Sequence, residues 1–140
     1  MISLLDTSAV LAHLRDEPGA DEVEAIFDDR SHEVLLSALT VAELARRLRS
    51  LGFDDAAIEA RVADYVALST RVVPVDTDVA RAAFDVCGRT PHRLPLVDAL
   101  IAASALREGA RLVHRDRHMA AIPTGVVDQL DLHSGAPRAE

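Results

Sequence analysis

The chain has 140 residues, of which 49% are apolar and 27% are charged, the balance of one ordinary globular domain. It contains no apolar stretch near the roughly 20 residues that a membrane span requires, and its N-terminus lacks the basic segment that precedes the hydrophobic core of a secretion signal. The single cysteine, Cys87, excludes an internal disulfide and favours a reducing, cytoplasmic location.

The net charge of −8 argues at first against a nucleic-acid partner, because nucleic-acid-binding proteins favour basic surfaces. The charge is unevenly distributed along the chain, however. Most of the acidic excess lies in residues 1–30, whereas residues 71–117 contain more arginines than acids. All 15 basic residues are arginines, so mechanisms that need a lysine are excluded.

The first half of the chain alternates between apolar strands and amphipathic helices. Pro18-Gly19 separates the first two helices, and Gly52 takes the position that glycine favours after a helix. In chain order we expect a strand at 2–5, helices at 7–15 and 20–29, a strand at 33–37, and helices at 39–51 and 54–69.

The second half continues this alternation. Pro74 predicts an edge position for the third strand, because proline cannot donate to a sheet ladder. Cys87 follows the apolar row of its helix and is expected to fill the core. In chain order we expect a strand at 72–75, a helix at 76–87, a loop at 88–96, a helix headed by Asp98, a strand at 111–115, a short helical turn and a last strand near Val126-Val127.

Strands separated by helices predict a parallel sheet with helices on both faces. The sequence therefore indicates an α/β fold, a three-layer α/β/α sandwich whose central, mainly parallel sheet has four to five strands. We expect one domain over residues 1–133. The small and polar residues 134–140 are expected to form a disordered tail.

Four acids stand where such a fold binds ligands. Asp6 and Asp116 end two apolar runs, Asp98 heads an apolar helix, and Glu43 lies one helical turn beyond a third run. The carboxyl ends of parallel strands share one edge of the sheet, so these side chains are expected to converge. A carboxylate cluster of this kind binds a divalent cation against a phosphate.

Each acid alone has an ordinary structural explanation. Asp6 and Asp98 suit helix N-caps, Asp116 suits a turn, and Glu43 is spaced to pair with Arg47 on a helix surface. Together they favour a site, because four converging carboxylates would repel one another and their pKa values would rise without a cation. Mg²⁺ or Mn²⁺, which prefer oxygen ligands, would compensate this charge.

Arginines near Asp98 and Asp116 favour a phosphate-containing substrate. With four aromatic residues in the chain, no base-stacking platform is visible. The candidate phosphate ligands are Arg89, Arg93, Arg115 and Arg117. For His114 and His118, which are separated by three residues, a surface or substrate contact is favoured over a zinc site.

The four acids lie in segments that resemble the motifs of PIN-domain ribonucleases, in the family's order and usual spacing over nearly the whole chain. The size, without an added domain, is similar to that of the VapC toxins of bacterial VapBC toxin–antitoxin pairs. His114 and Met119 depart from the pattern, which usually has threonine and an aromatic residue at these positions. The four segments are 6–10 (DTSAV), 37–44 (SALTVAEL), 96–103 (LVDALIAA) and 112–119 (LVHRDRHM).

The resemblance implies a PIN-like fold and a Mg²⁺-dependent endoribonuclease that acts as the toxin of a type II toxin–antitoxin system. Asp6 and Asp98 would bind the metal directly, with Glu43 and Asp116 as further ligands through water or to a second ion. The resemblance also implies an RNA substrate, a homodimer, and inhibition by a cognate VapB-type antitoxin. Apolar residues of helices 39–51 and 54–69 would form the antitoxin's groove.

Three alternatives remain beside this hypothesis. A phosphoaspartate enzyme or receiver domain also has acids at strand ends, but it needs a lysine, which this chain lacks. A catalytically silent PIN module would act only as a binding partner, and the presence of all four acids argues against it. A PIN nuclease of RNA processing, outside any toxin–antitoxin pair, is the third.

Overall fold

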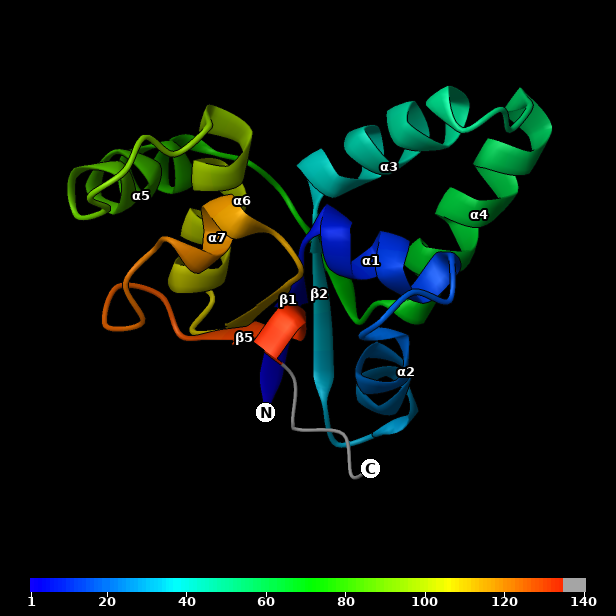
Figure 1. The fold of residues 1–140 in the computed structure, drawn as a ribbon, viewed down its shortest axis with the longest axis horizontal. Coiled ribbons are helices and arrows are strands. Elements are labelled where there is room, and N and C mark those ends of the chain that lie inside the picture. Colours follow the sequence, from blue (N-terminus) through cyan, green and yellow to red (C-terminus); the bar gives the residue numbers. More distant parts are fainter. Residues whose placement is uncertain (135–140) are drawn as a thin grey trace.

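The computed structural model describes residues 1–134 and contains one sheet of five parallel strands (Figure 1). Their order in the sheet is β3-β2-β1-β4-β5, with β1 at the centre. This confirms the α/β fold with a parallel sheet of four to five strands. The strands are β1 (Ile2–Leu5), β2 (Glu33–Ser37), β3 (Arg71–Val73), β4 (Arg111–His114) and β5 (Gln129–Asp131).

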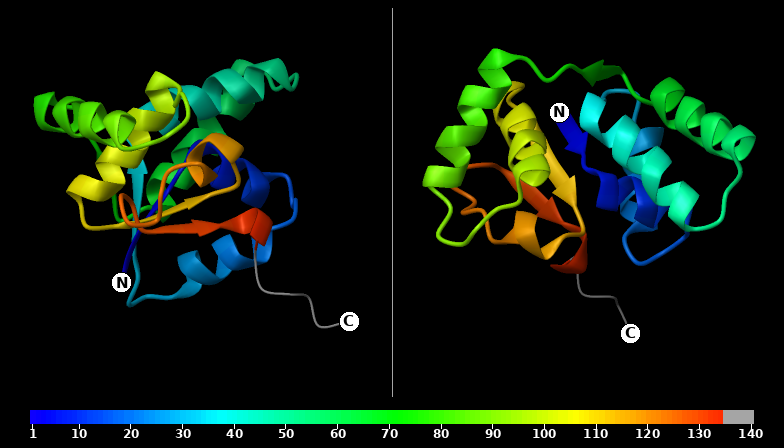
Figure 2. Two further views of the ribbon diagram at one scale, coloured as in Figure 1. Left: turned by 60° about the vertical axis from the view of Figure 1, so that its left-hand side comes forward. Right: turned by 90° about the horizontal axis from the view of Figure 1, so that it is seen from above.

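Helices cover both faces of the sheet, which confirms the three layers (Figures 1 and 2). One face carries α1 (Thr7–Leu14), α2 (Ala20–Asp28), α3 (Ala38–Ser50) and α4 (Asp55–Leu68). The other carries α5 (Thr77–Gly88), α6 (Leu96–Arg107) and α7 (Arg117–Ala120). Of the helices in the described part of the chain, none combines the length and apolar character needed to cross a membrane.

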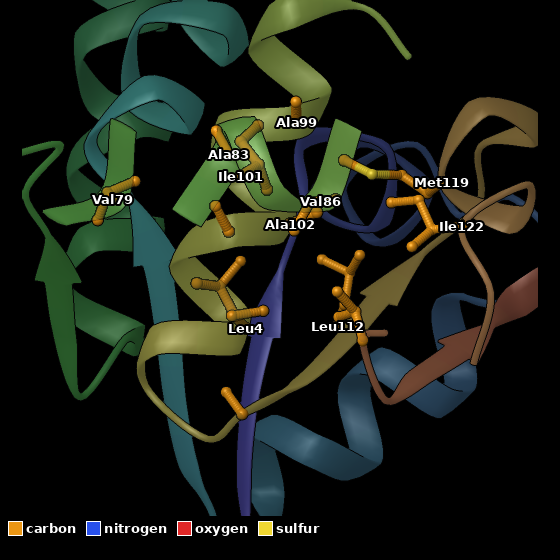
Figure 3. Close-up of a cluster of buried hydrophobic side chains, with 14 of the residues drawn as sticks. Leu4, Val79, Ala83, Val86, Ala99, Ile101, Ala102, Leu112, Met119 and Ile122 are labelled. Atoms are coloured by element: carbon orange, nitrogen blue, oxygen red, sulfur yellow. The ribbon is translucent and has the colours of Figure 1, made fainter. Parts of the chain in front are cut away.

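The two layers of helices enclose two apolar cores, because successive side chains of a strand point to opposite faces of the sheet. Leu4 lies in the core beneath α5, α6 and α7, together with Leu112 of the neighbouring strand (Figure 3). Leu5 and Val113, one residue further along the same strands, lie in the core beneath α1 to α4. Both central strands are therefore buried on both faces.

The last strand begins two residues later than the sequence pattern suggested. Val126 and Val127 are buried in the core, but their amides bond to the carbonyl of Pro123 in a turn rather than to a strand. The sheet ladder is formed by Gln129–Asp131, which pairs with β4 from Leu112 onward. An apolar pair that fills the core from a loop has the same sequence signature as a short buried strand.

The prediction that Cys87 fills the core is wrong, because its side chain is exposed. α5 buries Val79, Ala83 and Val86, and at 100° per residue Cys87 lies about 70° around the helix from the centre of that row. Other details agree better with expectation: β3 is an edge strand, and Gly52 follows α3 with a positive φ of 92°.

The described chain ends in a 3₁₀ helix, Leu132–Ser134. This helix includes the first residue of the expected tail. The rest of that tail, residues 135–140, lies outside the described residues.

Candidate metal centre

The strand order brings two of the four acids to adjacent strand ends. β1 and β4 are hydrogen-bonded neighbours, so Asp6, which follows β1, lies beside the end of β4, and its amide donates to the carbonyl of Val113 at 3.0 Å. The chain proceeds to β2 and β3 on one side of β1, whereas β4 and β5 lie on the other. This is the type of switch point at which open α/β sheets bind ligands.

Asp6 is buried, and its carboxylate is oriented by a backbone amide and a hydroxyl group. Its Oδ1 caps α1 by accepting from the amide of Ala9 at 2.9 Å, and it also accepts from the hydroxyl of Ser8 at 2.6 Å. The Ser8 oxygen in turn accepts from the amide of Arg115 at 2.8 Å. Ser8 thus joins the first acid to the loop that carries the fourth.

The pKa of Asp6 is raised from 3.8 to about 7, chiefly by burial. The charges of Asp116 and Asp98 contribute to this rise, and its hydrogen bonds from Ser8 and Ala9 oppose it. The interpretation of Asp6 as a helix cap is therefore correct but incomplete. A cap alone does not require a carboxylate with only 3% of its residue surface exposed.

Asp98 belongs to the first turn of α6 and is not its N-cap. The helix begins at Leu96, and the capping position is held by Pro95, without a side-chain hydrogen bond. The N-cap interpretation of Asp98 is therefore wrong. Burial raises the pKa of Asp98 to about 6, and the nearby charges of Asp116 and Glu43 contribute to this rise while His118 opposes it.

Asp116 and His118 lie directly beside Asp98. Asp116 caps the short helix α7 by accepting from the amide of His118 at 2.7 Å. The imidazole Nδ1 of His118 lies 3.4 Å from Asp116 Oδ1 and 3.5 Å from Asp98 Oδ2. These three residues each offer a ligand atom, all within 4.8 Å of one another.

The sequence expectation for His118, a surface or substrate contact, did not include its position beside Asp98 and Asp116. The sequence does contain a signal for this position. His118 lies two residues after Asp116, at the start of a helical turn, and this spacing brings its imidazole close to the capping carboxylate.

Glu43 approaches the site from α3. Its Oε1 accepts from the hydroxyl of Thr7 at 2.6 Å, and Thr7 is the residue that follows Asp6. Among the described residues no ion pair joins Glu43 to Arg47, so the surface-pair interpretation does not hold. The turn Asp6-Thr7-Ser8 therefore orients one carboxylate with each of its two hydroxyl groups.

His114, where PIN-domain ribonucleases usually have threonine, is fully buried and holds the loop before Asp116, so the expectation of a surface or substrate contact is wrong for this residue. Its Nδ1 accepts from the amide of Asp116 at 3.2 Å, which leaves the proton on Nε2 to donate to Gln129 Oε1 at 2.7 Å. The amide group of Gln129 then donates to the carbonyl of Ile122 at 2.8 Å. Met119, the second departure, is also fully buried in the core.

The four candidate phosphate ligands differ in their surroundings. Arg115 is partly buried and lies 3.7 Å from Glu17, and Arg117 is exposed between Asp116 and His118. Arg89 lies 3.7 Å from Asp85, on its own helix. Within residues 1–134 no hydrogen bond or ion pair connects Arg89 or Arg93 with the acids. The structure thus keeps two of the four near the site and does not bring the other two to it.

The donor set fits a divalent cation. Asp98, Asp116 and His118 lie together, and the charges of Asp6 and Glu43 are close enough to interact with this group. The two most buried of the four acids, Asp6 and Asp98, have pKa values raised toward neutrality. A bound cation would remove that repulsion and favour the charged forms. The lysine-dependent alternatives stay excluded, because the only cationic side chains are arginine and histidine.

Comparisons with known proteins agree with this geometry. A family model for the PIN domain matches residues 3–124, whereas no curated protein matches the chain. The solved structure of FitAcB from Neisseria gonorrhoeae is similar over 95% of this chain and 99% of that chain, with 25% identity and a TM-score of 0.73.

Two structures from Mycobacterium tuberculosis are also similar. VapBC-5, a member of the VapBC family of toxin–antitoxin systems, has 26% identity and a TM-score of 0.64 over 93% of this chain and 98% of that chain. VapC20, a toxin that cleaves the sarcin–ricin loop, has 25% identity and a TM-score of 0.65 over 86% and 94%.

Replacing His114 is expected to destabilise the fold. His114→Ala leaves the amide of Asp116 and the carbonyl oxygen of Gln129 without their partner and opens a buried cavity, at a cost of about 2–4 kcal/mol. Urea unfolding measures this difference. The exposed histidine variant His92→Ala is the control and should stay within about 0.5 kcal/mol of the wild type. An equally small effect of His114→Ala would contradict the hydrogen-bonding role.

The raised pKa of Asp6 predicts how stability depends on pH in the absence of divalent cations. The folded state holds the proton up to about pH 7 and the unfolded state releases it near 3.8, so this residue lowers stability as pH rises between these values. Asp6→Asn keeps the capping oxygen without the charge. It should match the wild type near pH 4 and exceed it at pH 8, by on the order of 3 kcal/mol.

Denaturant unfolding in EDTA at both pH values measures this effect. Asp64→Asn, at an exposed acid of α4, is the control and should give no such pH-dependent gain. If the free energies of unfolding of the wild type and Asp6→Asn change with pH in the same way, the charge of the Asp6 carboxylate does not destabilise the fold.

Proposed function

This chain belongs to the PIN domain family, and we propose that it is a cytoplasmic Mg²⁺-dependent endoribonuclease and the toxin of a type II toxin–antitoxin pair. The observation that carries the proposal is the convergence of Asp6, Glu43, Asp98 and Asp116, which couple electrostatically at the carboxyl ends of β1 and β4. The likeness to VapC20, which cleaves RNA, supports RNA as the substrate.

In this mechanism Asp6 and Asp98 would hold Mg²⁺, or Mn²⁺, and Glu43, Asp116 and His118 would complete its surroundings. The bound ion would supply an activated water nucleophile and stabilise the charge that develops on the phosphate. The reaction forms a bond between the water oxygen and phosphorus and breaks one phosphodiester P–O bond.

The chain's own contribution is to orient the carboxylates before the substrate binds. Oδ1 of Asp6 is held by Ser8 and Ala9, and Oε1 of Glu43 is held by Thr7. Among the described residues, the second oxygen of each of these carboxylates accepts no hydrogen bond. Each acid is therefore fixed through one oxygen and leaves the other for the ion, as preorganised catalytic sites require.

Removing the charge of Asp6 or Asp98 should abolish the activity. Asp6→Asn and Asp98→Asn each are expected to lower the rate of RNA cleavage more than about 100-fold, since the loss of a direct ligand exceeds that of an outer partner. EDTA should stop wild-type cleavage, and added Mg²⁺ or Mn²⁺ should restore it. The measurements are cleavage of total RNA in vitro and growth after induction, with Asp64→Asn as the matched control.

The outcomes separate the alternatives. If both variants leave cleavage and growth inhibition unchanged, the metal mechanism is wrong and a silent binding module is favoured. If the wild type cleaves RNA but its induction leaves growth unaffected, the protein is a nuclease outside a toxin–antitoxin pair. Sequencing the cleaved RNA ends would identify the substrate.

The partners in this proposal are a VapB-type antitoxin and a second copy of the chain. The hairpin of α3 and α4 exposes Val66 and Leu68, apolar side chains suited to an antitoxin's groove. On the opposite layer, Phe84 of α5 has 85% of its surface exposed and Leu96 of α6 has 70%. Apolar groups this exposed are typical of interaction surfaces.

We assign the surface of α5 and α6 to the homodimer. Phe84→Glu should convert the dimer to a monomer in light scattering after size-exclusion chromatography, because it places a charge in an apolar interface. Leu68→Glu on α4 is the control and should leave the dimer intact. An unchanged mass for Phe84→Glu would move the interface elsewhere.

A further inference from the structure

A polar cavity of about 470 Å³ opens beside Glu43 along one face of α3. Its size lies within the range of small-ligand pockets, which is roughly 300–1,000 Å³. Its lining is formed by Thr7, Leu11, Glu43, Arg46, Arg47 and Ser50. Because Thr7 and Glu43 are hydrogen-bonded to each other at the metal centre, the cavity is a direct extension of that centre.

The geometry of α3 places two arginines next to the acids. Arg46 and Arg47 lie three and four residues after Glu43, on the same face and roughly 5–6 Å further along the helix axis. Leu44 and Leu48 on the other face are buried against the sheet, which fixes the rotation of the helix. The helix therefore cannot rotate about its axis and carry the two guanidinium groups away from the cavity.

These arginines are available to an anion. In the part of the chain that the structure describes, neither forms an ion pair with a carboxylate. Several other arginines are paired with acids: Arg115 lies beside Glu17, Arg49 beside Asp55, and Arg71 is bonded to Glu108. The one carboxylate in the cavity lining, Glu43, is held by Thr7.

The lining also indicates what kind of anion fits. It contains no aromatic side chain, so it offers no platform on which a base could stack. Ser50 donates its hydroxyl to the carbonyl of Arg47, which leaves its oxygen as an acceptor for a sugar hydroxyl. Leu11 supplies a small apolar surface. Guanidinium groups match phosphate oxygens with paired hydrogen bonds.

We propose that this cavity binds the sugar–phosphate backbone of the RNA next to the scissile bond, with Arg46 and Arg47 on a phosphate. The inference rests on the proposed ribonuclease function and gives it a substrate subsite that differs from the four arginines expected from the sequence. The subsite reads the backbone and not the base, so it contributes affinity and position without sequence preference.

The test measures RNA binding without cleavage. In the Asp98→Asn background, the double variant Arg46→Ala/Arg47→Ala is titrated with a fluorescein-labelled single-stranded RNA of mixed sequence, and anisotropy is followed at several salt concentrations. We expect about tenfold weaker binding. The slope of log K against log salt should fall by about 0.7 for each phosphate that the variant no longer neutralises.

The matched control is Arg61→Ala/Arg81→Ala, which removes the same charge from exposed positions on α4 and α5 outside the cavity. It should bind RNA as tightly as the background protein and with the same slope. Arg46→Lys/Arg47→Lys keeps the charges without the paired geometry, and it should recover the slope and only part of the affinity. Thermal unfolding checks that all variants are folded.

If the RNA affinity and the salt slope of Arg46→Ala/Arg47→Ala lie within twofold of the control, the proposed subsite is wrong. Cleavage of RNA by the wild type would still support the ribonuclease function. If the double variant binds RNA normally but no longer binds the cognate VapB-type antitoxin, the cavity holds an acidic segment of that partner. The RNA assignment is then wrong. If the wild-type protein cleaves no RNA, the proposed function itself fails. The three results are distinct.

Discussion

The site depends on the contact between β1 and β4 just beyond their last paired residues. There the amide of Asp6 bonds to Val113, and the hydroxyl of Ser8 bridges the carboxylate of Asp6 and the amide of Arg115. These bonds join the beginning of the chain to a loop more than a hundred residues later. Because the remaining acids reach the same point from α3, α6 and α7, a displacement of this junction would separate all of them.

The same junction stores an electrostatic cost. Asp6 is buried and Asp98 is partly buried, both near other acids, and their pKa values rise to about 7 and about 6 as a result. A fold selected for stability alone would place apolar or neutral groups there, since unpaired buried charge is among the strongest destabilising features. The two apolar cores supported by the central strands offset this electrostatic cost, and a bound divalent cation would remove it. Local instability that a ligand removes is typical of functional sites.

The sequence pattern predicted the sheet, the layers and the four acids because these depend on local periodicity and on the common edge of parallel strands. It failed where tertiary packing decides. Val126 and Val127 fill the core from a turn, and Cys87 lies just outside the buried row of α5. Asp98 resembles an N-cap in the sequence because the actual capping residue, Pro95, has no side chain that could make a capping hydrogen bond. The sequence does not predict the positions of His118 and of the arginines of α3 relative to the acids. These positions depend on which loop and which helix face pack next to the acids, and residue spacing alone does not determine that packing.

Under the proposed function, the arrangement explains how a chain with net charge −8 would bind an anionic substrate. At physiological ionic strength charges are screened beyond about 8 Å, so RNA senses the groups at the site more than the total. There a bound divalent cation would offset two of the four acidic charges, and Arg46 and Arg47 lie next to Glu43 on α3. Without the cation the same surface would repel phosphate through its carboxylates. Metal binding would therefore make the local field less negative, and substrate affinity is expected to depend on metal occupancy as well as on monovalent salt.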